Sequence, residues 1–164
     1  MKAREGGFGM KAAEDAEPSA DALLRHYLRA LSFRLEHVLA SADAAFGDFD
    51  AGQGARTPSE IVRHLSGLIV FVGEQYGGPS RAALPALGWQ AERDRFRTQL
   101  RALEALLGAG AARRGPLSAF QLWQGPLADA MTHVGQLALL RRLAGAPSAP
   151  VRYWQADLAG DEPG

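Results

Sequence analysis

Apolar side chains recur at three- and four-residue intervals in four stretches of this chain, which is the spacing of amphipathic helices. We expect helices over about residues 21–42, 58–76, 89–107 and 122–144. No stretch alternates apolar and polar residues as a half-buried strand would. Four such helices in one domain predict an all-α four-helix bundle.

The first three predicted helices each carry one apolar stripe that we expect to face the core. The stripe of the first helix comprises Leu24, Tyr27, Leu31, Leu35 and Val38. That of the second comprises Ile61, His64, Leu68 and Phe71, and that of the third comprises Trp89, Phe96, Leu100, Leu103 and Leu107. His64 thus falls in the middle of an apolar stripe, where burying an imidazole costs free energy unless a partner meets it.

Local signals mark where the second helix begins and ends. In "TPSE" at 57–60, Thr57 suits the N-cap, Pro58 the first helical position and Glu60 the third. "GGPS" at 77–80 ends the helix. Residues 41–56, rich in Gly and Asp, predict a long loop without a period of its own.

The last predicted helix contains "DAMTHVGQLALLRR" at 129–142. Asp129, His133 and Gln136 share one strip of it, whereas Arg141 and Arg142 lie elsewhere on its surface. We therefore expect the strip to face the bundle axis. Another face of this helix is also apolar, formed by Leu127, Met131, Val134 and Ala138. We expect a homodimer contact, or the C-terminal tail, to cover that face.

Composition narrows the classes of protein. The chain has 164 residues, with 18 basic and 18 acidic side chains, so its zero formal charge argues against nucleic acid as a partner. No apolar run is long enough to span a membrane. Cysteine is absent, which excludes disulfides and thiolate zinc sites and fits a cytoplasmic location. We expect residues 1–19 to form a mobile leader, with Met1 or Met10 as the start, and residues 20–164 to form one domain.

His64, Asp129 and His133 form a candidate metal site. Side chains four positions apart on a helix lie close enough to chelate one ion, and a third ligand from a facing helix would complete an open site. Gln136 could orient a ligand by a hydrogen bond or serve only in packing. The alternative for the pair on the last helix is a carboxylate hydrogen-bonded to an imidazole, with no metal.

Other polar side chains are interpreted as structural. His26 and His37 flank the stripe of the first helix and are expected at the surface or its edge. Glu92 could be a fourth ligand or a general base, but we expect a solvated glutamate at a helix start. Arg63 and Arg81 are expected to be surface arginines, with carboxylate binding as the alternative.

Two segments carry a resemblance to a known family. "TPSEIVRHLSGL" at 57–68 and "THVGQLALLRRLAGAP" at 132–147, with the tail "YWQADLAG", resemble the DinB-like (YfiT-like) superfamily of metal-dependent bundles. The resemblance implies an up-down-down-up four-helix bundle, often a homodimer. It also implies a metal held by one histidine of the second helix and a His-x-x-x-His pair of the last.

The resemblance extends to ligands and to activity, with one departure. His64 and His133 match family ligands, whereas Asp129 stands where the pair has its first histidine. Two histidines and a carboxylate can bind Zn, Ni, Mn or Fe, and the carboxylate shifts preference toward Mn or Fe. The implied activity is that of a metal-dependent hydrolase, or of a thiol S-transferase using bacillithiol or mycothiol. The alternative is a non-catalytic binding or interaction bundle that has lost the metal.

Overall fold

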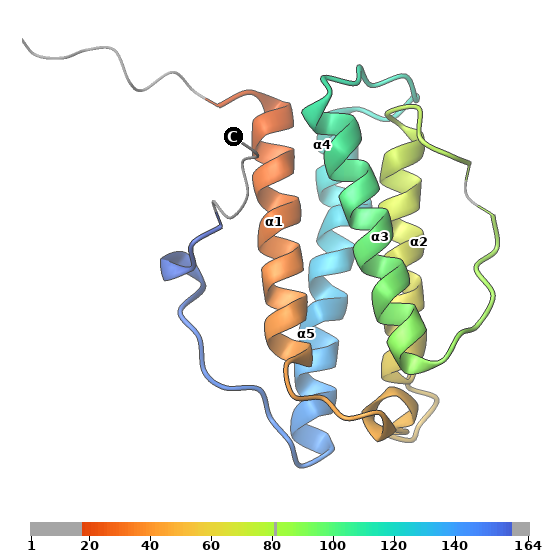
Figure 1. The fold of residues 1–164 in the computed structure, drawn as a ribbon, viewed down its shortest axis with the longest axis vertical. Helices are drawn as coiled ribbons and strands as arrows, with labels where there is room; N and C mark the ends of the chain where they lie inside the picture. The colour runs from red at the N-terminus through yellow and green to blue at the C-terminus, as the bar shows by residue number, and fades with distance from the viewer. Residues whose placement is uncertain (1–17, 81, 159–164) are drawn as a thin grey trace, which may run out of the picture.

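The computed structural model describes residues 18–80 and 82–158, and the regular structure in these ranges is entirely helical. Four long helices form the body of the molecule, and shorter turns lie between and after them (Figure 1). The elements are α1 (Ala20–Leu39), η1 (Ala45–Asp48), α2 (Pro58–Glu74), α3 (Trp89–Gly108), α4 (Ala119–Leu122), η2 (Trp123–Leu127), α5 (Ala128–Leu143) and η3 (Tyr153–Gln155). No helix in the described ranges is long and apolar enough to cross a membrane.

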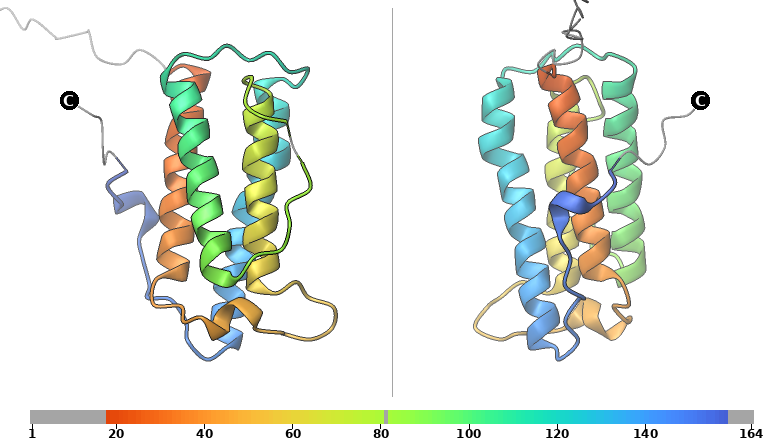
Figure 2. Two further views of the ribbon diagram at one scale, coloured as in Figure 1. Left: turned by 45° about the vertical axis from the view of Figure 1, so that its right-hand side comes forward. Right: turned by 90° about the vertical axis from the view of Figure 1, so that its left-hand side faces the viewer.

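The four long helices form the predicted up-down-down-up bundle. α1 and α5 run in one direction and α2 and α3 in the other (Figures 1 and 2). Because α2 and α3 are parallel, the segment between them, described at residues 75–80 and 82–88, returns along the length of the bundle. The predicted leader falls almost wholly on residues 1–17, which lie outside the described residues.

Helix α2 begins where the local signals predict. The Thr57 side chain accepts a hydrogen bond from the backbone N–H of Glu60, and the Glu60 carboxylate accepts one from the N–H of Thr57 (2.9 Å). Pro58 occupies the first position, where no N–H is needed. This capping box fixes the register of α2 and therefore the side of the helix on which His64 lies.

The predicted loop at 41–56 does more than connect two helices. Its short turn η1 inserts Phe46 into the core, where the ring packs edge-to-face on Trp89 with centroids 5.8 Å apart. A side chain at Gly47 would meet the Cβ of Trp89 at 2.6 Å, so the turn can approach α3 only with glycine there. The sequence analysis missed this contribution, because a single core residue in a loop has no periodicity.

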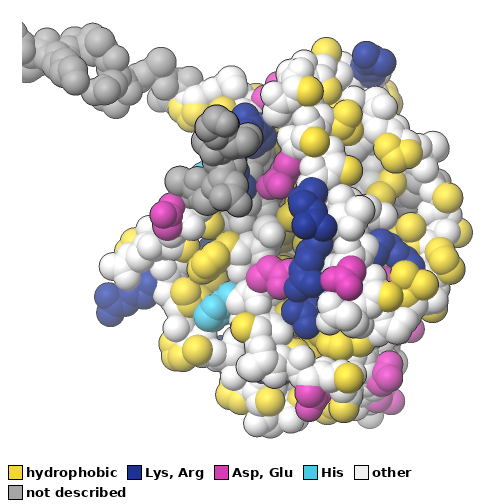
Figure 3. Space-filling view, viewed as in Figure 1, with side chains coloured by type: hydrophobic (Ala, Val, Ile, Leu, Met, Phe, Trp, Pro, Cys, Tyr) yellow, Lys and Arg dark blue, Asp and Glu magenta, His cyan; other side chains and the backbone are white. Residues whose placement is uncertain are grey.

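Helices α1 and α3 are joined across their exposed faces by charged side chains. Arg97 donates from Nε and Nη2 to the two carboxylate oxygens of Glu36, each at 2.7 Å. These hydrogen bonds raise the pKa of Arg97 above its ordinary value and outweigh the opposing effect of burial. Basic and acidic side chains lie side by side on this face of the molecule (Figure 3).

The tail folds back, as predicted, but onto α1 rather than α5. Tyr153 packs against Phe33 and lies under the guanidinium of Arg34, 3.8 Å from ring centroid to Cζ. His37, predicted at the surface or edge, donates from Nε2 to the carbonyl of Ala149 (2.7 Å). Trp154 belongs to this tail, which was one of the two alternatives for covering the last helix, and its side chain is 80% exposed.

The orientation of α5 differs from the prediction. Its core face includes Leu127 and Val134, the side expected to need a dimer partner, and both are buried within the bundle. Arg141, expected to point away, is also buried, with its guanidinium 5.3 Å from the ring of Phe46. The other helices of the same chain therefore cover this apolar face. The homodimer remains a prediction supported by the resemblance alone.

We predict that Phe46→Ala lowers the free energy of unfolding by about 3 kcal/mol, because it removes a ring from a closely packed site and leaves a cavity. Phe120→Ala is the matched control, since that ring is 84% exposed. Urea denaturation of the two variants measures the difference. Equal stability would show that η1 does not anchor the bundle.

Candidate metal centre

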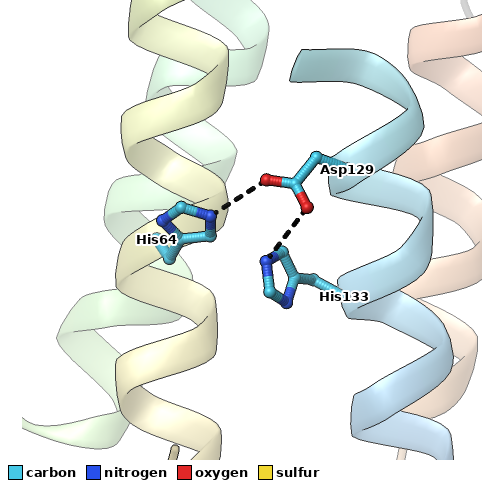
Figure 4. Close-up of side chains that lie close together, drawn as sticks. All are labelled: His64, Asp129 and His133. Carbon is cyan, nitrogen blue, oxygen red and sulfur yellow. Dashed lines mark hydrogen bonds and ion pairs between the residues drawn. The ribbon is translucent and has the colours of Figure 1, made fainter. Parts of the chain in front are cut away.

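Three side chains from two helices converge at one point (Figure 4). His64 projects from α2, and Asp129 and His133 project from successive turns of α5. Their ligand atoms all lie within 4.8 Å of one another. The structure thus brings together all three residues that the sequence analysis grouped, although α2 and α5 are far apart in the chain.

The carboxylate of Asp129 stands between the two imidazoles. Its Oδ2 lies 3.2 Å from Nε2 of His64, and its Oδ1 lies 3.4 Å from Nε2 of His133. The two rings are nearly perpendicular, with centroids 4.6 Å apart. Ligands held at about 2.1 Å in a tetrahedral site are roughly 3.4 Å from one another. The two separations from the carboxylate are of this size, and the full set of ligand atoms lies within the wider limit of 4.8 Å.

The cluster lies at the edge of the bundle rather than on its axis, which corrects the predicted position. The buried face of α2 is centred on Leu65 and Ile69 and leaves His64 beside it, with 31% of its side chain exposed. Asp129 is 47% exposed, and only His133 is nearly buried, at 9%. A site at the edge keeps coordination positions open toward solvent, as a catalytic metal requires.

Gln136 holds the ring of His133 in place. Its Oε1 lies 2.6 Å from Nδ1 of His133, one turn along the same helix. An amide oxygen can only accept, so this contact assigns the proton to Nδ1. The lone pair of a neutral imidazole is then on Nε2, which faces Asp129. A cation between that nitrogen and the carboxylate satisfies both, so these residues can hold a divalent metal ion.

A π turn sets the position of α5 just before the cluster. Pro126 has no N–H to donate, and the chain winds through η2 before the regular helix resumes. The hydroxyl of Tyr27 donates to the carbonyl of Leu127 at 2.6 Å, and its ring packs edge-to-face on Trp123. These contacts connect the start of α5 to α1, two residues before Asp129.

Glu92 does not belong to the cluster, and it is not the solvated glutamate that was expected. Its side chain is fully buried at the start of α3. One oxygen accepts a hydrogen bond from the backbone N–H of Leu87 (2.9 Å), and the other lies 3.4 Å from Nη1 of Arg95. Glu92 therefore joins the connecting segment to α3. His26 is exposed, as predicted, and Arg81 lies outside the described residues.

Two hollows flank the ligands, and the sequence analysis missed both. One, of about 300 Å³, has His64 in its wall together with Arg56 and Arg63. The other, of about 580 Å³, has Asp129 in its wall together with Leu68 and Phe71. No sequence signal marks them, because each is formed by side chains from segments that meet only in the fold.

The chain was also compared with family models, curated proteins and solved structures, and nothing matched. The likeness to DinB-like bundles therefore stays a resemblance carried by the segments at 57–68 and 132–147. The function is argued from the geometry of the site.

We predict that Gln136→Ala lowers the affinity for Zn²⁺ about tenfold or more, because the ring of His133 loses the acceptor that sets its tautomer. Gln90→Ala, on the exposed surface of α3, is the matched control. Competition with a chromophoric chelator measures both affinities. An unchanged affinity in Gln136→Ala would mean that the amide serves only in packing.

Proposed function

We propose that this protein is a divalent-metal-binding DinB-like protein acting as a metal-dependent enzyme, of the hydrolase or thiol S-transferase kind. The observation that carries the proposal is the convergence of His64, Asp129 and His133, with ligand atoms within 4.8 Å. The hydrogen bond from Nδ1 of His133 to Gln136 supports it, because that bond leaves Nε2 free for a metal.

The donor set limits the choice of metal. Two imidazole nitrogens and one carboxylate oxygen suit Zn, Mn, Fe and Ni. The carboxylate of Asp129 makes the set harder and more negative than three imidazoles would be, which favours Mn and Fe over softer ions. No thiolate competes, since the chain has no cysteine.

The place of the cluster supports a catalytic role over a purely structural one. Structural metal sites are closed by four protein ligands, whereas this group offers three side chains and is open on one side. A metal there would lower the pKa of a coordinated water or thiol, which is the chemistry shared by both proposed reaction types. The chain's own contribution is to orient His133 through Gln136 and to hold a substrate in the adjoining hollows.

One observation favours a second candidate function, a bundle that binds a partner or a small ligand without catalysis. Asp129 already lies within ion-pair distance of both histidines. If His64 and His133 are protonated, the carboxylate joins α2 to α5 by itself, and no metal is needed. The two candidates differ in what the purified protein contains.

We predict about one transition-metal ion per chain in protein purified without a histidine tag, and none in His133→Ala. His26→Ala is the matched control, because that imidazole is exposed on α1 and is not part of the cluster. Elemental analysis by mass spectrometry measures the content. Added Zn²⁺, Mn²⁺ or Ni²⁺ should also raise the melting temperature of metal-stripped wild type by several degrees, since a ligand at about 100 times its Kd stabilises by about 2.7 kcal/mol.

The opposite result is equally clear. Wild type that contains no metal, and whose melting temperature none of the three ions changes, would overturn the metal site and leave the non-catalytic bundle. Loss of metal in His26→Ala as well would place the ion elsewhere.

A further inference from the structure

The two hollows beside the ligands differ sharply in their chemistry. The first is polar and is lined by Arg56, Glu60, Arg63, His64, Gly67 and Leu84. The second is lined by Leu68, Phe71, Gln124, Pro126, Asp129 and Thr132. His64 lines the first and Asp129 the second, and Nε2 of His64 lies 3.2 Å from Oδ2 of Asp129, so the hollows lie on either side of the proposed metal centre.

The order of residues along α2 shows how the two hollows follow one another along the helix. Arg63 precedes His64, Leu68 follows one turn later, and Phe71 follows almost one turn after that. Eight residues of helix from Arg63 to Phe71 rise about 12 Å. A bound molecule that reaches both hollows therefore passes the ligands, with its basic contacts toward the start of α2 and its apolar contacts toward the end.

The charges of the first hollow select a monoanion. Among the described residues that line it, Arg56 and Arg63 supply two positive charges and Glu60 one negative charge, which leaves one net positive charge. Arg63 pairs only loosely with Glu60, at 4.0 Å, and Arg56 has no ion-pair partner among the residues that the structure describes. A carboxylate would complete the pairing, and the planar guanidinium groups suit it.

The second hollow selects an apolar group. Leu68, Phe71 and Pro126 provide carbon surface, beside the uncharged polar side chains of Gln124 and Thr132. Among the residues that the structure describes, Asp129 is the one charged residue of this lining. An unbranched hydrocarbon chain would bury apolar area there, at about 25 cal/mol for each Å² removed from water.

We propose that the two hollows together, called the groove below, bind a small amphipathic monoanion. Its carboxylate would lie at Arg56 and Arg63, a polar group at the proposed metal ligands, and an apolar chain against Leu68 and Phe71. This substrate class rests on the proposed function, since it places the polar group at the metal centre. It goes further by naming which end of the molecule lies on which side.

Gly67 keeps the first hollow open. It lies one turn beyond His64 in the wall of that hollow, and a Cβ built there has only the side chain of Leu84 near it, at 4.0 Å. A larger side chain at this position would extend into the hollow without replacing a ligand or an arginine. Gly135 on α5 is exposed and has nothing within 4 Å of such a Cβ, so it offers a matched substitution.

Three N-acyl derivatives of glycine test the proposal by isothermal titration calorimetry. N-octanoylglycine has all three parts, N-acetylglycine lacks the long chain, and N-octanoylglycinamide lacks the charge. With the Zn²⁺-loaded protein we expect N-octanoylglycine to bind about tenfold more tightly than either of the others. Equal affinity for the acid and the amide, equal affinity for the long and short acids, or no binding of any probe would overturn the proposal.

Variants assign the two ends. Arg63→Gln should lower the affinity for N-octanoylglycine about tenfold and leave the affinity for the amide unchanged. Phe71→Ala should lower the affinity for both long-chain probes and leave that for N-acetylglycine unchanged. Gly67→Leu should lower the affinity for N-octanoylglycine, whereas Gly135→Leu should leave it unchanged. The opposite pattern in either pair would contradict the assigned direction.

Repeating the titrations with chelator present separates this proposal from the metal proposal. If the protein takes up no metal but still discriminates among the probes, the proposed function fails and the amphipathic groove stands. If it takes up one ion per chain and does not discriminate, the metal centre stands and the substrate class is wrong.

Discussion

The candidate site depends on which face of α5 packs into the core of the bundle. Leu127, Val134 and Leu137 fill the core, and this choice of face turns Asp129 to the rim and leaves His133 at the boundary. The same rotation buries Arg141. A rotation of α5 that placed Asp129 and His133 on the axis would close the cluster off from solvent and expose part of the apolar face to water.

Asp129 governs the electrostatics of the site. It faces two imidazoles at 3.2 and 3.4 Å, so it acts either as a metal ligand or as the counter-ion of a protonated histidine. Oε1 of Gln136 accepts a hydrogen bond from Nδ1–H of His133, which leaves Nε2 facing the carboxylate, an arrangement that fits either role. A carboxylate beside two imidazoles gives the group one more negative charge than a third imidazole would.

The connections contribute as much to the site as the helices do. The return segment after α2 brings Leu84 to the wall of the first hollow, and the π turn before α5 brings Pro126 to the wall of the second. The connecting segment is joined to α3 by the buried carboxylate of Glu92. The two hollows thus lie where irregular segments meet the helices α2 and α5.

The sequence by itself determined the features that depend on neighbours along the chain. The capping box of Thr57 and Glu60 set the start of α2, and helical spacing placed Asp129, His133 and Gln136 on one strip. It also placed His64 on the facing helix, so the ligand group was predictable once the bundle was assumed. These inferences hold because helical geometry relates residues three and four apart whatever surrounds them.

Only the tertiary structure decided which way each helix faces. α5 is apolar on more than one side, so its pattern does not specify a core face, and contacts distant in sequence, such as Tyr27 with Leu127, chose it. The burial of Phe46, Glu92 and Arg141 has the same origin. Burial is a property of the surroundings, and a periodic pattern reports only which residues share a side of a helix, not what that side meets.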